Sequence, residues 1–131
     1  MAAAHPMTDK PHRVQLRREK GWRMPANTVK VDRATVFGNP FRVDIYGRAE
    51  AINLFRRWLT GQMSPREMSQ YSRPDRWAAR HVPLVTVREW LVTNLPRLKG
   101  KHLACWCPLT DKDGDPVPCH AQVLLELANG N

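Results

Sequence analysis

All three cysteines of the 131-residue chain lie in one stretch near its end, LACWCPLTDKDGDPVPCHAQVLLELANG, residues 103–130. One residue separates Cys105 from Cys107, and Cys119 is followed directly by His120. Thiols and imidazoles bind zinc, and a thiol beside an imidazole can also act as a nucleophile. This stretch is therefore the first candidate for a functional site.

Three interpretations of these residues stay open from their types and spacing. In the first, Cys105, Cys107, Cys119 and His120 bind a metal ion; the ligand types favour zinc, although C-x-C and C-H are not its usual spacings. In the second, Cys107 or Cys119 is a catalytic thiol or part of an anion site, with His120 as its partner. In the third, the cysteines pack as small hydrophobic residues and His120 caps a helix.

The flanking residues predict a strand that ends at Cys105 and a helix over 120–128. Residues 103–105 form a continuous apolar run, which is typical of a buried strand in a parallel or mixed sheet. The helix has apolar residues at helical spacing, and Gly130 follows its end. Ligands of α/β proteins bind beyond the carboxyl ends of strands, and helix N-termini present unpaired N–H groups. We therefore expect a site where this strand and this helix meet.

The rest of the chain supplies the elements that must position such a site. Alternating apolar and polar residues predict strands over 13–18 and 28–32. Apolar residues at helical spacing predict one helix between Gly47 and Gly61 and another over 84–95. The resulting order predicts an α/β fold: a single compact domain with a small parallel or mixed sheet packed by about three helices.

Two segments are expected to lie outside this regular frame. Residues 1–12 are polar and contain prolines, so we expect a disordered arm that precedes a single domain over 13–131. Residues 62–82 are basic and poor in large apolar side chains. They predict an irregular excursion from the domain, with a short helix near Trp77.

The composition limits the class of protein and the kind of partner. Lys and Arg outnumber Asp and Glu by 21 to 12, and the net charge is +9. Such a balance favours polyanionic partners, with nucleic acid or a nucleotide first among them. No apolar run approaches the roughly 18 residues of a membrane span. Three cysteines cannot all pair within one chain, and the chain start lacks a signal-peptide core, so we expect a cytoplasmic protein with reduced thiols.

Three motifs in a fixed order carry a resemblance to a known family. They are VKVDRATVFGNPF at residues 29–41, GRAEAINLFRRWL at 47–59, and LACWCP followed by PCHAQVLLELAN at the end. Together they resemble a family of small phage and bacterial proteins, the domain of unknown function numbered 4326. The resemblance implies an α/β domain with a shared site and no established activity. Asp32 stands where the family more often has glycine, and the loop between Cys107 and Cys119 is longer than the family's.

The resemblance also implies which residues complete the site. We expect Arg33, Asn39 and Arg48 to face the Cys-His loop and bind a ligand, with Trp106 as a wall. Arginines bind phosphate or carboxylate through paired N–H bonds, and a G-N-P turn can present backbone N–H groups to an anion. The alternatives are surface arginines, and an asparagine that satisfies its own turn.

The remaining tryptophans divide by their surroundings. Trp58 and Trp90 lie on apolar helical faces and are expected in the core. Trp22 and Trp77 lie in basic loops, where they either stack on bases or anchor their loops.

Two hypotheses for the function follow. In the first, a small basic protein binds a nucleotide or nucleic acid at the Cys/His/Arg site, and whether it also modifies the nucleotide or base as an enzyme stays open. In the second, the chain is a non-catalytic DNA- or RNA-binding accessory protein whose cysteines are structural or bind zinc. The sequence leaves the oligomeric state open.

Overall fold

The structure is a computed structural model that describes residues 10–75 and 80–130. Its elements follow one another in the order β1 (Arg13–Gln15), β2 (Thr28–Lys30), α2 (Val43–Tyr46), α3 (Arg48–Leu59), α4 (Pro65–Met68), β3 (Ser72–Asp75), β4 (Arg80–Pro83), α5 (Leu84–Asn94), η2 (Leu95–Leu98), β5 (His102–Cys105) and α6 (His120–Ala128). Most of the predicted arm, and the predicted short helix at Trp77, lie outside the described residues.

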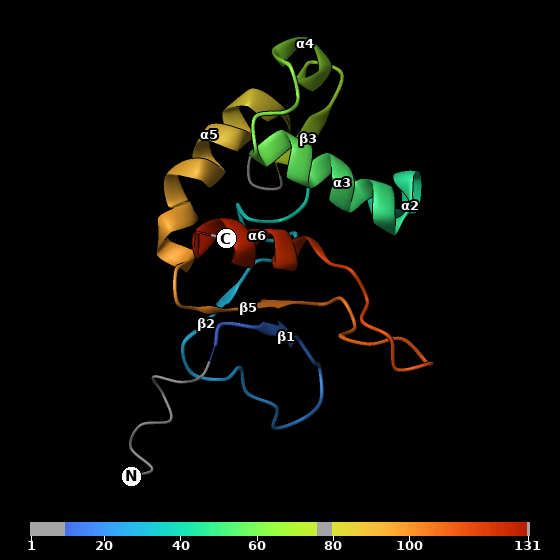
Figure 1. The fold of residues 1–131 in the computed structure, drawn as a ribbon, viewed down its shortest axis with the longest axis vertical. Helices are drawn as coiled ribbons and strands as arrows, with labels where there is room; N and C mark the ends of the chain where they lie inside the picture. The colour runs from blue at the N-terminus through green and yellow to red at the C-terminus, as the bar shows by residue number, and fades with distance from the viewer. Residues whose placement is uncertain (1–9, 76–79, 131) are drawn as a thin grey trace.

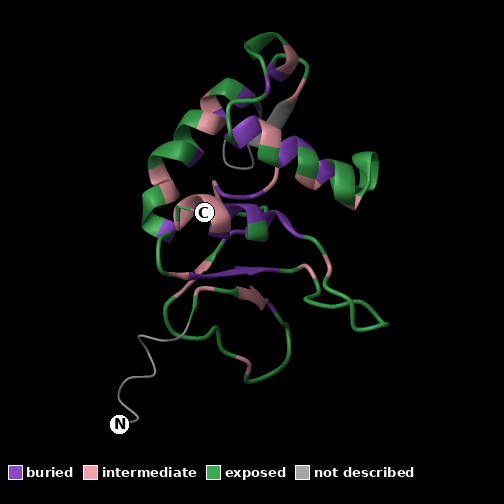
Figure 2. Ribbon diagram, in the orientation of Figure 1, coloured by how far each residue is buried: buried purple, intermediate pink, exposed green. Residues whose placement is uncertain are grey.

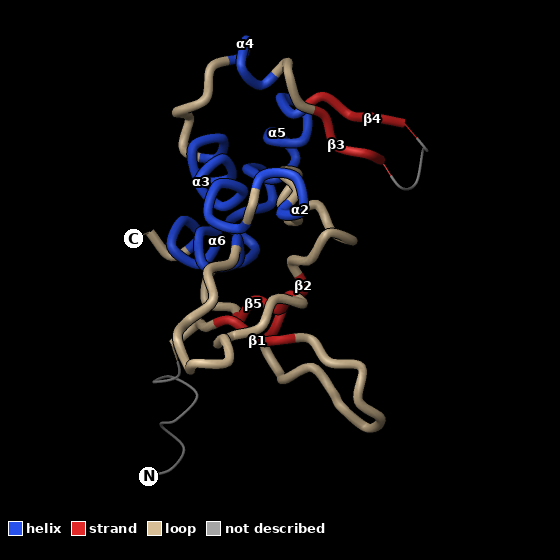
Figure 3. The backbone as a smooth tube through the Cα atoms, turned by 90° about the vertical axis from the view of Figure 1, so that its right-hand side faces the viewer, coloured by secondary structure: helices blue, strands red, loops and turns tan. Residues whose placement is uncertain are grey.

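A three-stranded parallel sheet carries the site, and its order is β1-β5-β2. The central strand β5 pairs Ala104 with Val14 on one side and Leu103 with Val29 on the other. All four residues of β5 are buried, as its continuous apolar run predicts. The helices lie on one side of this sheet, and the loop between β1 and β2 extends away from them (Figures 1 and 3). The predicted α/β domain with a small parallel sheet is therefore confirmed.

Three long helices lie on one side of the sheet, with α6 next to β5 and α3 and α5 farther away (Figure 1), and they correspond closely to those predicted. Predicted and observed bounds agree for α6, and α3 begins after Gly47 and ends two residues before Gly61, where φ is +81°. The helix α5 ends at Asn94 and continues as the short 3₁₀ helix η2. None of the helices within the described ranges has both the length and the apolar character to cross a membrane.

The core lies between these helices and the sheet, where Figure 2 shows the inner faces buried. Trp58 on α3 has no exposed surface, which confirms its predicted core position. The same prediction for Trp90 is wrong, because 45% of its surface is exposed. The helix α5 buries a stripe through Leu84, Val87 and Leu91. Trp90 is one residue, about 100° around the helix, from Leu91 and therefore lies on the flank of this stripe.

Residues 62–82, predicted as an irregular excursion, contain a short helix and a two-stranded ribbon. Ser64 accepts a hydrogen bond from the Glu67 N–H at 3.1 Å, and Pro65 occupies the first turn, so α4 has both usual start signals. The strands β3 and β4 pair antiparallel, although β3 contains Pro74. The residues of β3 and β4 do not alternate between apolar and polar, which is why sequence periodicity does not predict this ribbon.

Candidate functional site

The carboxyl ends of the three parallel strands meet at one edge of the sheet. Backbone bonds continue just past the strands, from Leu16 N–H to the Cys105 carbonyl and from Val31 N–H to the Ala104 carbonyl, both at 2.8 Å. The residues that follow β1, β5 and β2 are thereby held next to one another. Figure 1 shows that α3 and α6 also begin on this side of the molecule.

The three cysteine sulfurs converge at this edge. Residues two apart on an extended strand share a face but lie about 6.6 Å apart. Here β5 ends at Cys105 and the chain bends at Trp106 and Cys107, while Cys119 is the N-cap of α6. The three sulfurs all lie within 4.8 Å of one another, and those of Cys105 and Cys119 are 3.0 Å apart. Cys105 and Cys119 are buried, whereas Cys107 is half-buried.

Arg48, the first residue of α3, contacts this thiol cluster. Its Nη1 donates to the Cys107 sulfur at 3.3 Å and to the Pro118 carbonyl at 3.4 Å. The Nε and Nη2 groups have no hydrogen-bond partner within residues 10–75 and 80–130. A guanidinium carries five N–H donors, so several remain for a further acceptor.

Cys107 is the most acidic of the three thiols. The neighbouring Cys105 and Cys119 thiols, together with Arg48, hold the pKa of the Cys107 thiol far below its ordinary value, against the opposing effect of burial. The pKa of Cys105 is raised by its bonds to Cys107 and Cys119 and by burial. Cys107 is therefore the thiol of the cluster that loses its proton most readily.

His120 is buried behind the cluster in a defined tautomer. Its Nε2 lies 2.6 Å from the Val31 carbonyl oxygen, and this oxygen can only accept, so Nε2 carries the proton. The unprotonated Nδ1 lies 3.6 Å from the Cys119 sulfur. Burial is the main cause that lowers the pKa of His120, so the ring is neutral at pH 7. His120 does not belong to the set of atoms that lie within 4.8 Å of one another, which contains the three sulfurs.

Comparison with known proteins assigns the chain to a family. The sequence profile described as domain of unknown function (DUF4326) matches residues 14–130, which include the sheet, all three cysteines and Arg48. The chain belongs to this family. The resemblance inferred from the three motifs is thus confirmed. Neither a curated protein nor a solved structure matches the chain.

Two further residues implied by the DUF4326 motifs have different positions. Asn39 forms its own turn: its Oδ1 accepts from Phe41 N–H at 2.9 Å and its Nδ2 donates to the Ala51 carbonyl at 3.1 Å. It therefore ties the GNPF turn to α3. This is the alternative in which the asparagine satisfies its own turn. Arg33 follows Asp32 at the sheet edge and is exposed.

Gly38 of the GNPF motif is required by close packing. A Cβ at this position would lie 2.6 Å from the Arg33 Cα and 2.7 Å from the Asp32 carbonyl oxygen. Both are backbone atoms that cannot rotate away. The glycine thus lets the GNPF turn pack against the chain that follows β2, and so fixes Asp32 and Arg33 at the edge.

Two charged residues of the site, Asp32 and Arg13, were not among the predicted site residues. Asp32, which has 8% of its surface exposed, accepts from Trp106 Nε1 through Oδ2 at 3.0 Å. Arg13 donates to the Val117 carbonyl at 2.6 Å and to the Pro108 carbonyl at 3.0 Å, so it fastens both ends of the loop between Cys107 and Cys119 to β1. Asp32 at the end of a predicted strand is a usable signal, but backbone carbonyl partners leave no sequence signal for Arg13.

Trp106, between Cys105 and Cys107 in the chain, has 42% of its surface exposed. The Arg18 guanidinium lies 4.8 Å from its ring centroid, a cation–π contact. Asp32 holds the indole N–H, so the ring is fixed from two sides. That Trp106 forms a wall of a ligand site stays a prediction.

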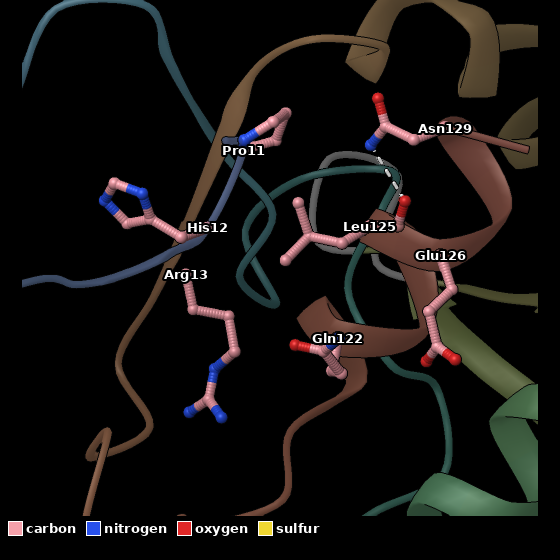
Figure 4. A pocket seen from close by; sticks show the side chains of 7 residues that line it. All are labelled: Pro11, His12, Arg13, Gln122, Leu125, Glu126 and Asn129. Atoms are coloured by element: carbon pink, nitrogen blue, oxygen red, sulfur yellow. Dashed lines mark hydrogen bonds between the residues drawn. The ribbon is translucent and has the colours of Figure 1, made fainter. Parts of the chain in front are cut away.

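A groove of about 250 Å³ lies elsewhere, between the N-terminal segment and the outer side of α6. Figure 4 shows the residues that line it: Pro11, His12, Arg13, Gln122, Leu125, Glu126 and Asn129. None of the thiols lines this groove. Arg13 belongs to both regions, because its guanidinium reaches the loop that closes the thiol cluster.

Proposed function

We propose that this DUF4326 protein binds a nucleotide or nucleic acid at the carboxyl edge of its sheet, with a phosphate group at Arg48. The observation that carries the proposal is the position of Arg48. Its Nη1 is fixed by Cys107 and Pro118, while Nε and Nη2 remain for a bidentate acceptor. A fixed guanidinium suits phosphate because its fork of donors matches two phosphate oxygens.

The backbone around Arg48 favours an anion in the same place. Arg48 opens α3 and Cys119 caps α6, so two helix N-termini with partial positive charge lie near Cys107. The N-cap residue of α3, Gly47, provides no side-chain cap for the first N–H groups. The net charge of +9 adds a long-range attraction for polyanions.

Trp106 supports a ligand that carries a base as well as a phosphate. Its indole is partly exposed, and Asp32 and Arg18 fix its orientation. Base stacking on a fixed aromatic ring contributes about 1–3 kcal/mol per base. Trp106 precedes Cys107 in the chain and Arg48 contacts the Cys107 sulfur, so a ligand that reaches both Trp106 and Arg48 would lie next to Cys107. We further propose that the protein works in the cytoplasm, where its thiols stay reduced.

Binding by charge-matched variants tests this proposal. We expect reduced wild-type protein to bind fluorescein-labelled nucleotides or random oligonucleotides in an anisotropy titration. Arg48→Gln should weaken binding by about 10- to 100-fold, since a charge-assisted bond contributes about 1.5–3 kcal/mol. The matched control is Arg57→Gln on the same helix, because Arg57 is already paired with Glu67.

Two results would contradict the proposal. One is equal binding by wild type and Arg48→Gln in a preparation that circular dichroism shows to be folded. The other is an affinity that does not change with salt, because phosphate contacts release counterions and weaken as salt rises.

A further inference from the structure

We infer that the sulfurs of Cys105, Cys107 and Cys119 form a binding site for one thiophilic metal ion, with zinc as the ion of best fit. The site would have three protein ligands and an open fourth position. This inference goes beyond the proposed ligand binding and does not require it. It rests on the positions of the sulfurs and on their surroundings.

The distances suit a tetrahedral ion with little rearrangement. Zinc–sulfur bonds of about 2.3 Å place tetrahedral sulfurs about 3.8 Å apart. The three sulfurs lie within 4.8 Å of one another, and the Cys105–Cys119 pair would separate by less than about 1 Å from its 3.0 Å. Each sulfur comes from a different local structure, namely a strand end, a bend and a helix N-cap. All three cysteines of the chain are used.

The surroundings compensate the charge of such a centre. A zinc ion with three thiolates carries one net negative charge. Arg48 donates to the Cys107 sulfur at 3.3 Å, and the Ala121 N–H donates to the Cys119 sulfur at 3.4 Å. Hydrogen bonds of this kind stabilise metal-bound thiolates and orient them. The same contacts would be unusual around cysteines that serve only as small hydrophobic residues.

His120 supports the site from behind. Its Nε2–H is donated to the Val31 carbonyl, which keeps Nδ1 turned toward Cys119 at 3.6 Å. Because the ring stays outside the mutual distance of 4.8 Å that unites the sulfurs, it is a positioning residue and not a fourth ligand. The open fourth position is typical of zinc sites that bind or activate an exogenous group.

Metal analysis and cobalt substitution of the full chain test the inference. Protein purified without chelator, incubated with zinc and dialysed should contain close to one zinc ion per chain by mass spectrometry. Replacement by Co²⁺ should give sulfur-to-cobalt charge-transfer bands and the strong visible bands of tetrahedral cobalt. In the zinc-loaded protein, the half-buried Cys107 should react slowly with a thiol reagent and should react faster after the zinc is removed by a chelator.

Variants separate metal binding from ligand binding. Cys107→Ser removes the half-buried ligand of the three. It should weaken zinc binding by more than about 100-fold, which is the upper cost of losing a residue that only supports a metal ligand. Arg48→Gln removes a donor to the Cys107 sulfur, so it should weaken zinc binding by at most about 10- to 100-fold while it also weakens binding of the phosphate ligand. Arg57→Gln is the matched control, because Arg57 pairs with Glu67, and its metal ratio should stay near one. Loss of metal from Cys107→Ser with intact metal in Arg57→Gln would therefore support the inference even if no nucleotide binds.

A metal ratio near zero after incubation with zinc, with no cobalt charge-transfer bands, would overturn the inference. Rapid alkylation of Cys107 alone under these conditions would assign the cluster to thiol chemistry instead. The cobalt titration of wild-type protein decides the question even if Cys107→Ser fails to fold.

Discussion

Two arginines of the helix α3 show how differently the same side chain is used in this protein. Arg57, near the helix end, donates two hydrogen bonds to the Glu67 carboxylate at 2.7 and 3.1 Å. Arg48, at the helix start, donates through one nitrogen to a sulfur and a carbonyl. The first charge is neutralised within the molecule, whereas the second keeps donors for an external anion. Net charge alone therefore does not locate the site; the partners of each cation do.

The same distinction separates the two long connections of the chain. The connection that contains α4, β3 and β4 is held to α3 by the salt bridge between Arg57 and Glu67. The loop between Cys107 and Cys119 is fastened by Arg13 through the carbonyls of Pro108 and Val117. Backbone carbonyls carry no net charge, so the fastening of the second loop leaves positive charge at the sheet edge.

The largest predicted effect on the free energy of unfolding comes from the residue that holds this second loop. Arg13→Met removes two charge-assisted bonds and should lower the free energy of unfolding by about 2 kcal/mol in urea denaturation. It should also make residues 106–118 easier to cleave in limited proteolysis. Arg17→Met is the matched control, because among the described residues Arg17 pairs only with the exposed Glu19. Equal losses for both variants would mean that Arg13 does not fasten the loop.

The pH dependence should report on the buried imidazole. The folded-state pKa of His120 is lowered, so below about pH 6.5 the unfolded state binds a proton that the folded state excludes. Stability of the metal-free, reduced protein should therefore fall as pH drops, by up to about 1.4 kcal/mol per pH unit for this group. His120→Gln, which keeps an N–H for the Val31 carbonyl, should remove this part of the slope. An unchanged slope between pH 6.5 and 5 would show that His120 is protonated in the fold.

The smallest effect is expected at Arg57. Its side chain and that of Glu67 are each about one-third exposed, at 32% and 30%, so solvent screens their pairing. Arg57→Gln should lower the free energy of unfolding by less than about 1 kcal/mol. It should leave nucleotide or oligonucleotide binding unchanged. A loss of binding as large as that of Arg48→Gln would remove the contrast between the two arginines.

Much of the fold can be predicted from the sequence because its regular elements have clear periodicity and end signals. The apolar run 103–105 predicts the buried central strand, and the helix 120–128 has the predicted bounds. The ribbon of β3 and β4 could not be predicted in this way, because Pro74 and its neighbours lack strand periodicity. Trp90 was misplaced because a helical apolar stripe can be narrower than its apolar residues suggest.

The site could be predicted only in part, for a different reason. The types and proximity of Cys105, Cys107 and Cys119 already suggest a cluster, and the structure brings their sulfurs together. Arg13 acts through backbone carbonyls some 95 and 104 positions away in the chain, and spacing carries no trace of such bonds. Asn39 shows the opposite case, since a polar residue in a shared motif turned out to hold its own turn.

Protection of Cys107 by a bound ligand tests the central claim most directly. In metal-free, reduced protein, the alkylation rate of Cys107 is measured by mass spectrometry with and without a saturating nucleotide or oligonucleotide whose binding has been verified. If the ligand lies between Arg48 and Trp106, it should slow alkylation severalfold in wild type and in Arg57→Gln. An unchanged rate with the ligand fully bound would place binding elsewhere on the molecule and contradict the account.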